Sequence, residues 1–521
     1  YFVKKPDGSI SFRQNWLKDF ANVDFTNPDA VKFWQDLIRP TVKLGIWGFK
    51  ADDGEDIKPD DVFFDGRRGW ELHNEYSTLY NRALTELMEQ EGVDGLLWAR
   101  SGSLGNEQYP ALWAGDQYAR WDQLASLVPA GLSASMSGMP FWGHDIGGYV
   151  GQPTPELYIR WAQFGALSPL MQYHGVWRRE PWEFGPLAEE AYTLLAQLRM
   201  NLKPTLIELG HEVERAGLPI MRPMSMEFPQ DDRFAATDDQ YMLGPDMLVA
   251  PVLEEGHVGR AVQFPAGVWQ HALWPVSFEG PATREVPIGL LDAPLFVREG
   301  ATLKLQLAEG ARLGRWQPAD PVRDVSFAPT RAVIRNLKAP LRGSVLARTA
   351  TVEFDRAPGS TNGFRAYWFL DADPARRFPA GMATNGGQVF IDLSPGSGFN
   401  LLGRLQTYVI ETPDGAELFR GSIRWETPVA LEIDRSIIKV VKGGRETVET
   451  VLVNRSAAEI EVRVVAEASA GGRVATPAQT VTIPAQGRSP LRWEVDFDAS
   501  NAVGDTRVLF RVLSGGALLA R

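Results

Sequence analysis

The chain has 521 residues, no cysteine and a net charge of −12 from 53 basic and 65 acidic side chains. This length exceeds what one hydrophobic core can fill and predicts three or four domains. The negative charge is spread without long runs, which argues against nucleic acid or an anionic membrane as the partner. The absence of cysteine excludes disulfides and thiolate metal sites and leaves no redox clue to the compartment.

The start of the chain predicts a strand that enters a turn, "YFVKKPDGSI", rather than a signal peptide. Because it also lacks an initiator methionine, we expect the chain to begin within a longer protein. Any targeting segment would then be out of view, and both a cytoplasmic and a secreted location stay open. No apolar run approaches the roughly 18 residues that a membrane-spanning helix needs.

The first part of the chain alternates between strand-like and helix-like patterns. Residues 22–38 predict a strand followed by a helix with Asn27 as its cap and Pro28 as its first residue. Short apolar runs then predict strands at 47–52, 95–101, 139–145 and 170–175, and helical spacing separates them at 72–87, 119–137, 154–167 and 187–217. Strands that alternate with helices predict a parallel sheet. Closed into a ring, this is a (β/α)8 TIM barrel, whose active site lies at the carboxyl ends of its strands.

Acidic residues crowd the end of the first of these strands, in "GFKADDGED". Because side chains alternate along a strand, Lys50 and Asp52 share one face and Asp53 points to the other. Asp52 is therefore the acid that we expect to face the mouth of the barrel. Taken alone, such a cluster is more typical of a solvated loop that happens to follow a strand.

Polar side chains recur at the ends of the later strands, with aromatic residues beside them. The polar residues are Arg100, Asp116, His144, Asp145 and His174, and the aromatic residues are Trp98, Trp113, Trp142 and Tyr173. Each has a structural explanation when taken singly, but five strand ends in succession, counting that of Asp52, are hard to attribute to packing. Two carboxylates with an arginine and aromatic side chains are typical of glycoside hydrolysis, in which one acid attacks and the other transfers a proton.

The same segments carry a family resemblance. "FKADDGED", "ARSGSLGNEQYPALWAGDQ", "GLSASMSGMPFWGHDIGGY" and "MQYHG" resemble the successive motifs of glycoside hydrolase family 31, which holds α-glucosidases, α-xylosidases and α-transglucosylases. Residues 218–252 resemble the family's passage from the barrel into a C-terminal sandwich. The resemblance covers residues 1 to about 310, and we recognise nothing comparable beyond.

The resemblance implies a role for each matching residue. Asp52 stands at the position of the nucleophile and Asp116 at that of the acid/base, which implies carboxyl groups about 5 to 5.5 Å apart. We expect the proton on Asp116 to be favoured by an apolar setting beside Trp113. The expected substrate-binding residues are Lys50, Arg100, Trp113, Trp142, Asp145 and His174. The resemblance implies no metal and no cofactor, and the expected partner is an oligosaccharide or another α-glycoside.

The resemblance also implies that two barrel strands, a substrate-binding acid and a β-sandwich precede the region that matches residue 1. We therefore expect a preceding segment or another chain to complete the barrel, and residues 1–521 alone to be inactive and poorly folded there, since an open sheet exposes an apolar edge. A homo-oligomer stays open. The predicted domains are the barrel (1–232), a proximal sandwich (233–310), a second β domain (311–428) and an immunoglobulin-like sandwich (429–521).

Three functions remain in view. The first is a retaining, exo-acting α-glucosidase. The second is an α-xylosidase or α-transglucosylase of the same family, because the residues that admit or exclude a hydroxymethyl group would lie largely in the missing strands. The third, of another class, is a non-catalytic glycan-binding or scaffolding subunit, against which the Asp52 and Asp116 pair counts.

Overall fold

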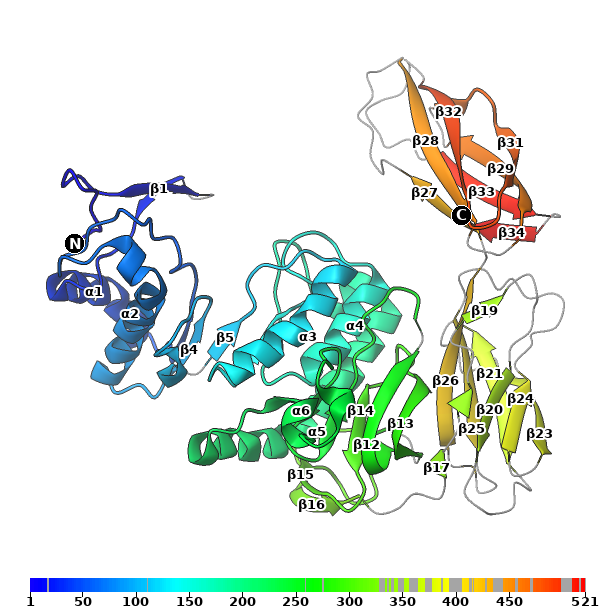
Figure 1. The fold of residues 1–521 in the computed structure, drawn as a ribbon, viewed down its shortest axis with the longest axis horizontal. Coiled ribbons are helices and arrows are strands. Elements are labelled where there is room, and N and C mark those ends of the chain that lie inside the picture. Colours follow the sequence, from blue (N-terminus) through cyan, green and yellow to red (C-terminus); the bar gives the residue numbers. More distant parts are fainter. Residues whose placement is uncertain are drawn as a thin grey trace. The chain divides into compact units, whose positions relative to one another are not determined.

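A computed structural model gives the architecture of the chain (Figure 1). Residues 1–256, 261–284 and 288–333 form one compact unit, and residues 257–260, 285–287 and 334–521 form another. The structure describes residues 1–15, 18–109, 111–257, 259–273, 276–327, 333–334, 337–338, 342–344, 351–355, 364–370, 377–385, 388–392, 405–411, 415, 417–426, 429–433, 444–454, 458–468, 472–497, 508–514 and 517–520.

The first unit opens with a hairpin and two helices. Strands β1 (Phe12–Asn15) and β2 (Lys18–Ala21) pair antiparallel, and helices α1 (Pro28–Lys43) and α2 (Gly69–Gln90) follow. The Asn27 side chain accepts a hydrogen bond of 3.0 Å from the Asp29 amide, so α1 begins with the predicted cap and with Pro28 at its first position. Helix α2 buries Leu72, Tyr76 and Ala83 in a core shared with Val3 and Phe25.

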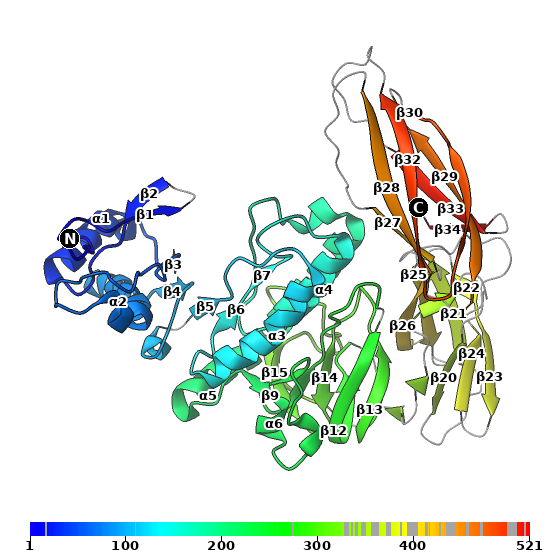
Figure 2. The same ribbon diagram turned by 45° about the horizontal axis from the view of Figure 1, so that its top comes forward.

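Parallel strands come next. Strands β3 (Gly48–Ala51), β4 (Leu96–Ala99), β5 (Ala111–Trp113) and β6 (Trp142–Gly143) form one parallel sheet in chain order, and β7 (Asp145–Ile146) pairs parallel with β8 (Gln172–Tyr173). Helices α3 (Trp121–Met136), α4 (Pro155–Ala166) and α5 (Pro186–Ala216) follow, with short 3-10 helices η1 (Asn106–Gln108) and η2 (Pro181–Phe184) between elements. Helix α3 packs against β6 and helix α4 against β7 (Figure 2). Among the described residues the parallel strands make one open sheet and one pair rather than a ring of eight.

An antiparallel sheet completes the first unit. Its strands are β9 (Met221–Pro223), β10 (Tyr241–Leu243), β11 (Met247–Val249), β12 (Gly259–His271), β13 (Ser277–Pro287), β14 (Leu295–Arg298) and β17 (Val333–Ile334), in the order β17-β13-β12-β14-β11-β10-β9. Helices α6 (Met224–Glu227) and η3 (Asp232–Phe234) lie between β9 and β10 in the sequence. Strand β15 (Thr302–Gln306) pairs with β16 (Val322–Ser326) in a separate hairpin.

Two predicted boundaries differ from these pairings. Strand β9 already belongs to the antiparallel sheet through β10, so that sheet begins before residue 233. The β15–β16 hairpin crosses residue 310, and Thr205 and Asn201 of α5 hold it by donating to the carbonyls of Lys304 (2.7 Å) and Gln306 (2.8 Å). Both differences arise because strand partners distant in the chain decide where a sheet begins and ends.

The second unit consists of β-sheets. One pair has the orders β18-β20-β24-β23 and β19-β26-β25-β21-β22, and the other has the orders β27-β28-β32-β30 and β31-β29-β33-β34. The strands are β18 (Leu337–Lys338), β19 (Arg342–Ser344), β20 (Thr351–Asp355), β21 (Arg365–Leu370), β22 (Phe378–Pro379), β23 (Gly381–Asn385), β24 (Gln388–Asp392), β25 (Leu405–Glu411), β26 (Glu417–Glu426), β27 (Val429–Ile433), β28 (Arg445–Asn454), β29 (Ile460–Ala468), β30 (Gly472–Val474), β31 (Ala478–Ile483), β32 (Arg488–Phe497), β33 (Val508–Ser514) and β34 (Ala517–Ala520).

The last two sheets enclose one core. Leu452 and Trp493 from one sheet pack with Val462, Val464 and Phe510 from the other. The two facing sheets make a β-sandwich (Figure 2). The alternating pattern that predicts a sandwich from residue 429 therefore matches two facing sheets. Among the described residues, no helix is both long enough and apolar enough to span a membrane.

Candidate active site

The ends of the parallel strands bring the predicted acidic and basic residues together. Asp52 directly follows β3, Arg100 directly follows β4, and Asp116 lies three residues beyond β5. Because the strands are parallel and adjacent, their carboxyl ends meet at one edge of the sheet. This edge holds the cluster that the sequence predicts.

Arg100 lies at the centre of the cluster. Its Nη1 donates to Asp52 Oδ1 at 3.0 Å and to Asp116 Oδ2 at 3.3 Å, and its Nε lies 2.9 Å from Glu55 Oε1. Burial lowers the pKa of Arg100, but the charges of Glu55, Asp52 and Asp116 outweigh it and raise the pKa above its ordinary value. The two candidate catalytic carboxylates therefore share one donor atom, Arg100 Nη1, so they lie side by side at the strand edge.

The loop after β3 presents Asp52 to the open site. The Asp52 side chain is half-exposed, and its Oδ1 also accepts a hydrogen bond of 2.9 Å from the Asp53 amide. Asp53 itself has a left-handed backbone with φ 58°, and its carbonyl accepts a bond of 2.8 Å from Ser101 Oγ. Burial, followed by the charge of Asp52, raises the pKa of Asp53.

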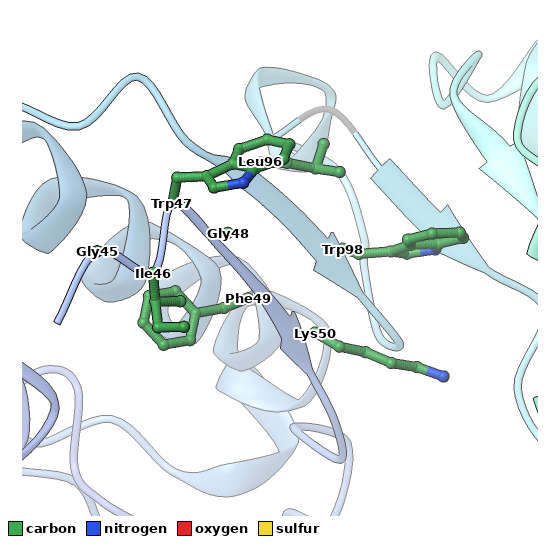
Figure 3. Close-up of a pocket in the computed structure, with 8 residues that line it drawn as sticks. All are labelled: Gly45, Ile46, Trp47, Gly48, Phe49, Lys50, Leu96 and Trp98. Atoms are coloured by element: carbon green, nitrogen blue, oxygen red, sulfur yellow. The ribbon is translucent and has the colours of Figure 1, made fainter. Parts of the chain in front are cut away.

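Lys50 and Trp113 form the neighbouring part of the site. Lys50 Nζ lies 4.1 Å from the centroid of the Trp113 ring, within cation–π distance. Trp113 is only 3% exposed, so Lys50 packs against a buried indole ring. Lys50 also lines a cavity of about 470 Å³ along β3 and β4, formed by Gly45, Ile46, Trp47, Gly48, Phe49, Lys50, Leu96 and Trp98 (Figure 3). In Figure 3 Lys50 and Trp98 extend the same way from the two strands.

Asp145 is the buried acid of the site. Its side chain has no exposed surface, Oδ1 accepts a hydrogen bond of 2.6 Å from Gln172 Nε2, and Oδ2 has no partner among the described residues. Burial raises its pKa to about 7; the charge of Lys50 opposes this shift and that of Asp116 reinforces it. A carboxyl group with one free oxygen and a pKa near neutrality suits hydrogen bonding to a ligand hydroxyl.

His174 lies beside a tyrosine that the sequence pattern did not predict for the site. Its ring centroid is 5.2 Å from that of Tyr149, at an angle of 40°. Burial, with the charge of Lys50 next, lowers the pKa of His174, and burial together with Asp116 and Asp52 raises that of Tyr149. Tyr149 therefore belongs to the site. The signal that marks it is its place at the end of "DIGGY", four residues after Asp145.

Trp142 does not join these residues. It is 4% exposed, packs on the rings of His144 (5.4 Å) and Phe164 (6.4 Å), and a Cβ added to Gly131 of α3 would come within 2.7 Å of it. It lies in the layer between sheet and helices, because alternation along residues 142–145 puts Trp142 and His144 opposite Asp145. The expected place of Trp142 in the wall of a sugar pocket thus has no support in its packing.

His144 is held as a core residue. It accepts from Trp161 Nε1 at 3.0 Å, contacts Ser168 Oγ at 3.1 Å and stacks on Phe164, and burial lowers its pKa to about 3. Two further residues belong to the site: Glu55, which contacts Arg100, and Gln172, which donates to Asp145. The sequence pattern does not predict them, because each contact joins segments that are distant in the chain.

Asp116 also differs from expectation, since its side chain is 35% exposed and bound to Arg100 rather than enclosed beside Trp113. The described residues contain no group of three or more acidic or histidine side chains suited to a metal ion.

Comparison with known proteins identifies the class. Residues 1–209 match the TIM-barrel domain of the glycosyl hydrolases of family 31, and residues 217–303 match that family's C-terminal domain. The chain therefore belongs to glycoside hydrolase family 31, with the TIM-barrel domain at its start and β domains after it.

Individual relatives match about half of the chain or somewhat more. An "Alpha-xylosidase" of Emericella nidulans is 38% identical over 259 residues, 49% of this chain and 33% of that protein. "Alpha-xylosidase XylQ" of Lactiplantibacillus pentosus is 37% identical over 316 residues (58% and 41%), and "Alpha-glucosidase 2" of Bacillus thermoamyloliquefaciens is 30% identical over 321 residues (58% and 41%). This chain thus spans well under half the length of these relatives.

A solved structure extends the likeness in fold. One such structure is the cycloalternan-forming enzyme of Listeria monocytogenes, solved with a pentasaccharide substrate. The match covers 98% of this chain and 54% of the enzyme's chain, with a TM-score of 0.59 and 21% identity. At that identity the likeness concerns the fold alone, and it includes the β domains beyond residue 303.

Proposed function

We propose that the protein is a retaining, exo-acting α-glycosidase that removes a terminal non-reducing α-linked sugar through a covalent glycosyl-aspartate intermediate. The observation that carries this proposal is the pair of carboxylates, Asp52 and Asp116, bound by the single guanidinium of Arg100. Such a pair on one strand edge suits attack by one carboxylate and proton transfer by the other.

In the first step, Asp52 Oδ attacks the anomeric carbon while the bond from that carbon to the leaving oxygen breaks. Asp116 gives its proton to that oxygen, so the aglycone leaves as a neutral alcohol. Arg100 Nη1 donates to Asp52 Oδ1 at 3.0 Å and so holds the attacking carboxylate in place. In the second step, Asp116 takes a proton from water, whose oxygen attacks the same carbon and releases Asp52. Two inversions give net retention.

The remaining residues of the site are suited to hold the sugar. Asp145 offers the free Oδ2, and His174 offers ring nitrogens beside Tyr149. Lys50 adds a cation near Asp145 that opposes its protonation. We assign these four residues to binding of the terminal sugar because they are polar or aromatic and surround the two catalytic carboxylates.

The sugar itself stays a prediction. The motifs of the sequence favour an α-glucosidase first. An α-xylosidase is the second candidate, and the similarity to two α-xylosidases at 37–38% identity supports this second candidate. The test is the initial rate of the complete natural protein on 4-nitrophenyl α-glucoside and α-xyloside. A higher kcat/KM on the xyloside reverses the order.

A trapping experiment separates the enzyme from a glycan-binding subunit. A 5-fluoro-α-glycosyl fluoride forms a slowly hydrolysed ester with a nucleophilic carboxylate, so the intact mass should rise by one fluoroglycosyl group. The same mass increase should be absent from Asp52→Ala. Labelling of neither protein, with glycan binding retained, would instead support the non-catalytic subunit.

A further inference from the structure

Two segments of the site, which carry Tyr149 and His174, meet around one buried arginine. Arg179 is 2% exposed, and its guanidinium donates to the carbonyls of Gly148 (Nε, 2.8 Å), Tyr149 (Nη2, 3.3 Å) and Gly151 (Nη2, 2.5 Å). It also donates through Nη1 to the carbonyls of Arg178 (3.1 Å) and Trp177 (3.4 Å). A single side chain thus crosslinks residues 148–151 to residues 177–179.

The backbone of both segments is shaped around this guanidinium. Gly147, Gly148 and Gly151 have φ values of 86°, 76° and 84°, which only glycine adopts without strain. A Cβ added to Gly175 would come within 2.7 Å of Arg179 Nε and 2.9 Å of its Cζ. The glycines after Asp145 and after His174 therefore leave the room that the arginine fills.

The crosslink continues into the strand edge. The Tyr149 amide donates to the Gln117 carbonyl at 2.8 Å, and the Val176 amide donates to the Tyr149 carbonyl at 3.0 Å. Gln117 follows Asp116 directly, and Val176 lies two residues after His174. Arg179 is in turn anchored by Tyr158 of α4, whose hydroxyl donates to the Arg179 carbonyl at 2.7 Å.

We propose that Arg179 is a positioning residue that sets the distance between Tyr149 and His174, and that this distance decides how tightly the site binds the terminal sugar. The inference rests on the proposed function for its kinetic consequence, but the positioning itself does not. Guanidinium donors fixed on five carbonyls hold two loops in one geometry, whereas water or a lysine ammonium offers no planar fork. A displacement of about 1 Å in such a site costs on the order of 100-fold, which we expect to appear in kcat/KM.

The kinetic test compares Arg179→Ala with Arg178→Ala in the complete natural protein. We expect kcat/KM of Arg179→Ala to fall about 100-fold, mainly through a higher KM, with partial recovery on adding methylguanidinium. Arg178 is the matched control, since its side chain is 77% exposed and pairs with Glu183 at 3.0 Å, so its removal should leave both constants unchanged. Arg179→Lys should not restore KM. Wild-type kcat and KM in Arg179→Ala would overturn the inference.

Gly175→Ala keeps the test decisive if Arg179→Ala is poorly folded, because it leaves the arginine in the chain, and a double-mutant cycle extends the test where both variants fold. Gly175→Ala displaces the guanidinium without removing it and should also raise KM. In the Arg179→Ala background the added methyl has nothing to displace, so its effect should vanish. Additive effects of the two substitutions would overturn the inference.

Two further readouts distinguish positioning from general stability. The charge of Arg179 lowers the pKa of Asp145 and of His174, so its removal should shift the pH profile of kcat/KM to higher pH, and an unshifted profile counts against the inference. Hydrogen exchange of the Tyr149 and Val176 amides should accelerate in Arg179→Ala and not in Arg178→Ala. If the wild-type protein is inactive on every glycoside while this local exchange changes as expected, the proposed function fails and the positioning role stands. Unchanged exchange overturns the positioning role.

Discussion

At the residue scale, the two neighbouring acids Asp52 and Asp53 have different environments. Asp52 contacts Arg100 and is half-exposed at the site, whereas Asp53 contributes its amide and carbonyl to the loop. We expect Asp52→Ala to abolish turnover of every glycoside, and Asp53→Ala to cost about tenfold, or about 1.4 kcal/mol in the activation barrier. Steady-state rates with 4-nitrophenyl glycosides measure both. Loss of activity in Asp53→Ala with Asp52→Ala still active would contradict the assignment.

Asp116 has a separate signature as acid/base. Asp116→Ala should slow substrates whose leaving group needs a proton far more than an α-glycosyl fluoride, which needs little such help. Release of the sugar should then stall for lack of a base, and azide, which needs no deprotonation, should restore turnover as the α-glycosyl azide. Product analysis by chromatography checks this outcome. The role of Asp116 is refuted if azide never restores turnover.

Asp145 predicts a pH effect on stability. Its folded pKa of about 7 lies above its ordinary value of 3.8, so between these values the folded protein binds more protons than the unfolded one, and stability falls as pH rises. The slope is at most about 1.4 kcal/mol per pH unit. Buried His144 and His271, each with a pKa of about 3, act in the opposite direction up to pH 6.5, so only a comparison isolates Asp145. Asp145→Asn should therefore gain stability over the wild type on going from pH 4.5 to 7.5, measured by thermal unfolding. An equal pH dependence in both proteins would contradict the burial of a titrating carboxyl group.

At the scale of elements, the loop after β3 depends on a glycine. Gly54 has φ 89°, and a Cβ there would come within 2.6 Å of Ser101 Oγ and 2.9 Å of the Tyr80 ring. Gly54→Ala should cost about 1 kcal/mol in backbone strain and also displace the loop that carries Asp52, lowering kcat by about 100-fold.

Gly66 is the matched control for Gly54, with φ 88° and open space around the added Cβ. Gly66→Ala should show a similar loss of stability with unchanged kcat. Denaturant unfolding and steady-state kinetics of both variants test the distinction. Equal kcat in the two variants would show that the loop tolerates the clash.

At the scale of the whole molecule, every candidate site residue lies in the first compact unit, whereas the C-terminal sandwich has a core of its own. Trp493 is buried there, donates to Thr450 Oγ1 at 3.0 Å and packs edge-on against Phe510. Trp493→Ala should destabilise the sandwich by about 3–5 kcal/mol and leave kcat/KM on a 4-nitrophenyl glycoside unchanged. Calorimetry together with kinetics checks this, and a matching loss of activity would tie the sandwich to catalysis.

The sequence by itself determined what depends on neighbouring residues in the chain. The helical spacing of apolar residues, with Asn27 before Pro28, predicts where α1 begins. The alternation of side chains along a strand selects Asp52 over Asp53 as the acid that faces the site. Motifs in order predict the family and the gathering of Asp52, Arg100 and Asp116 at one edge, because parallel strands put their carboxyl ends together.

Only the tertiary structure decided what depends on contacts between distant segments. Trp142 packs among His144 and Phe164, Tyr149 joins His174, and Arg179 holds their two loops, although neither burial nor partner is encoded in local period. The domain boundaries differ from prediction for the same reason. Strand β9 joins the antiparallel sheet by pairing with β10, and β16 joins the separate hairpin by pairing with β15. The stability of a strand pair depends on which segments come together in the folded protein, and the local pattern of apolar residues does not specify those partners.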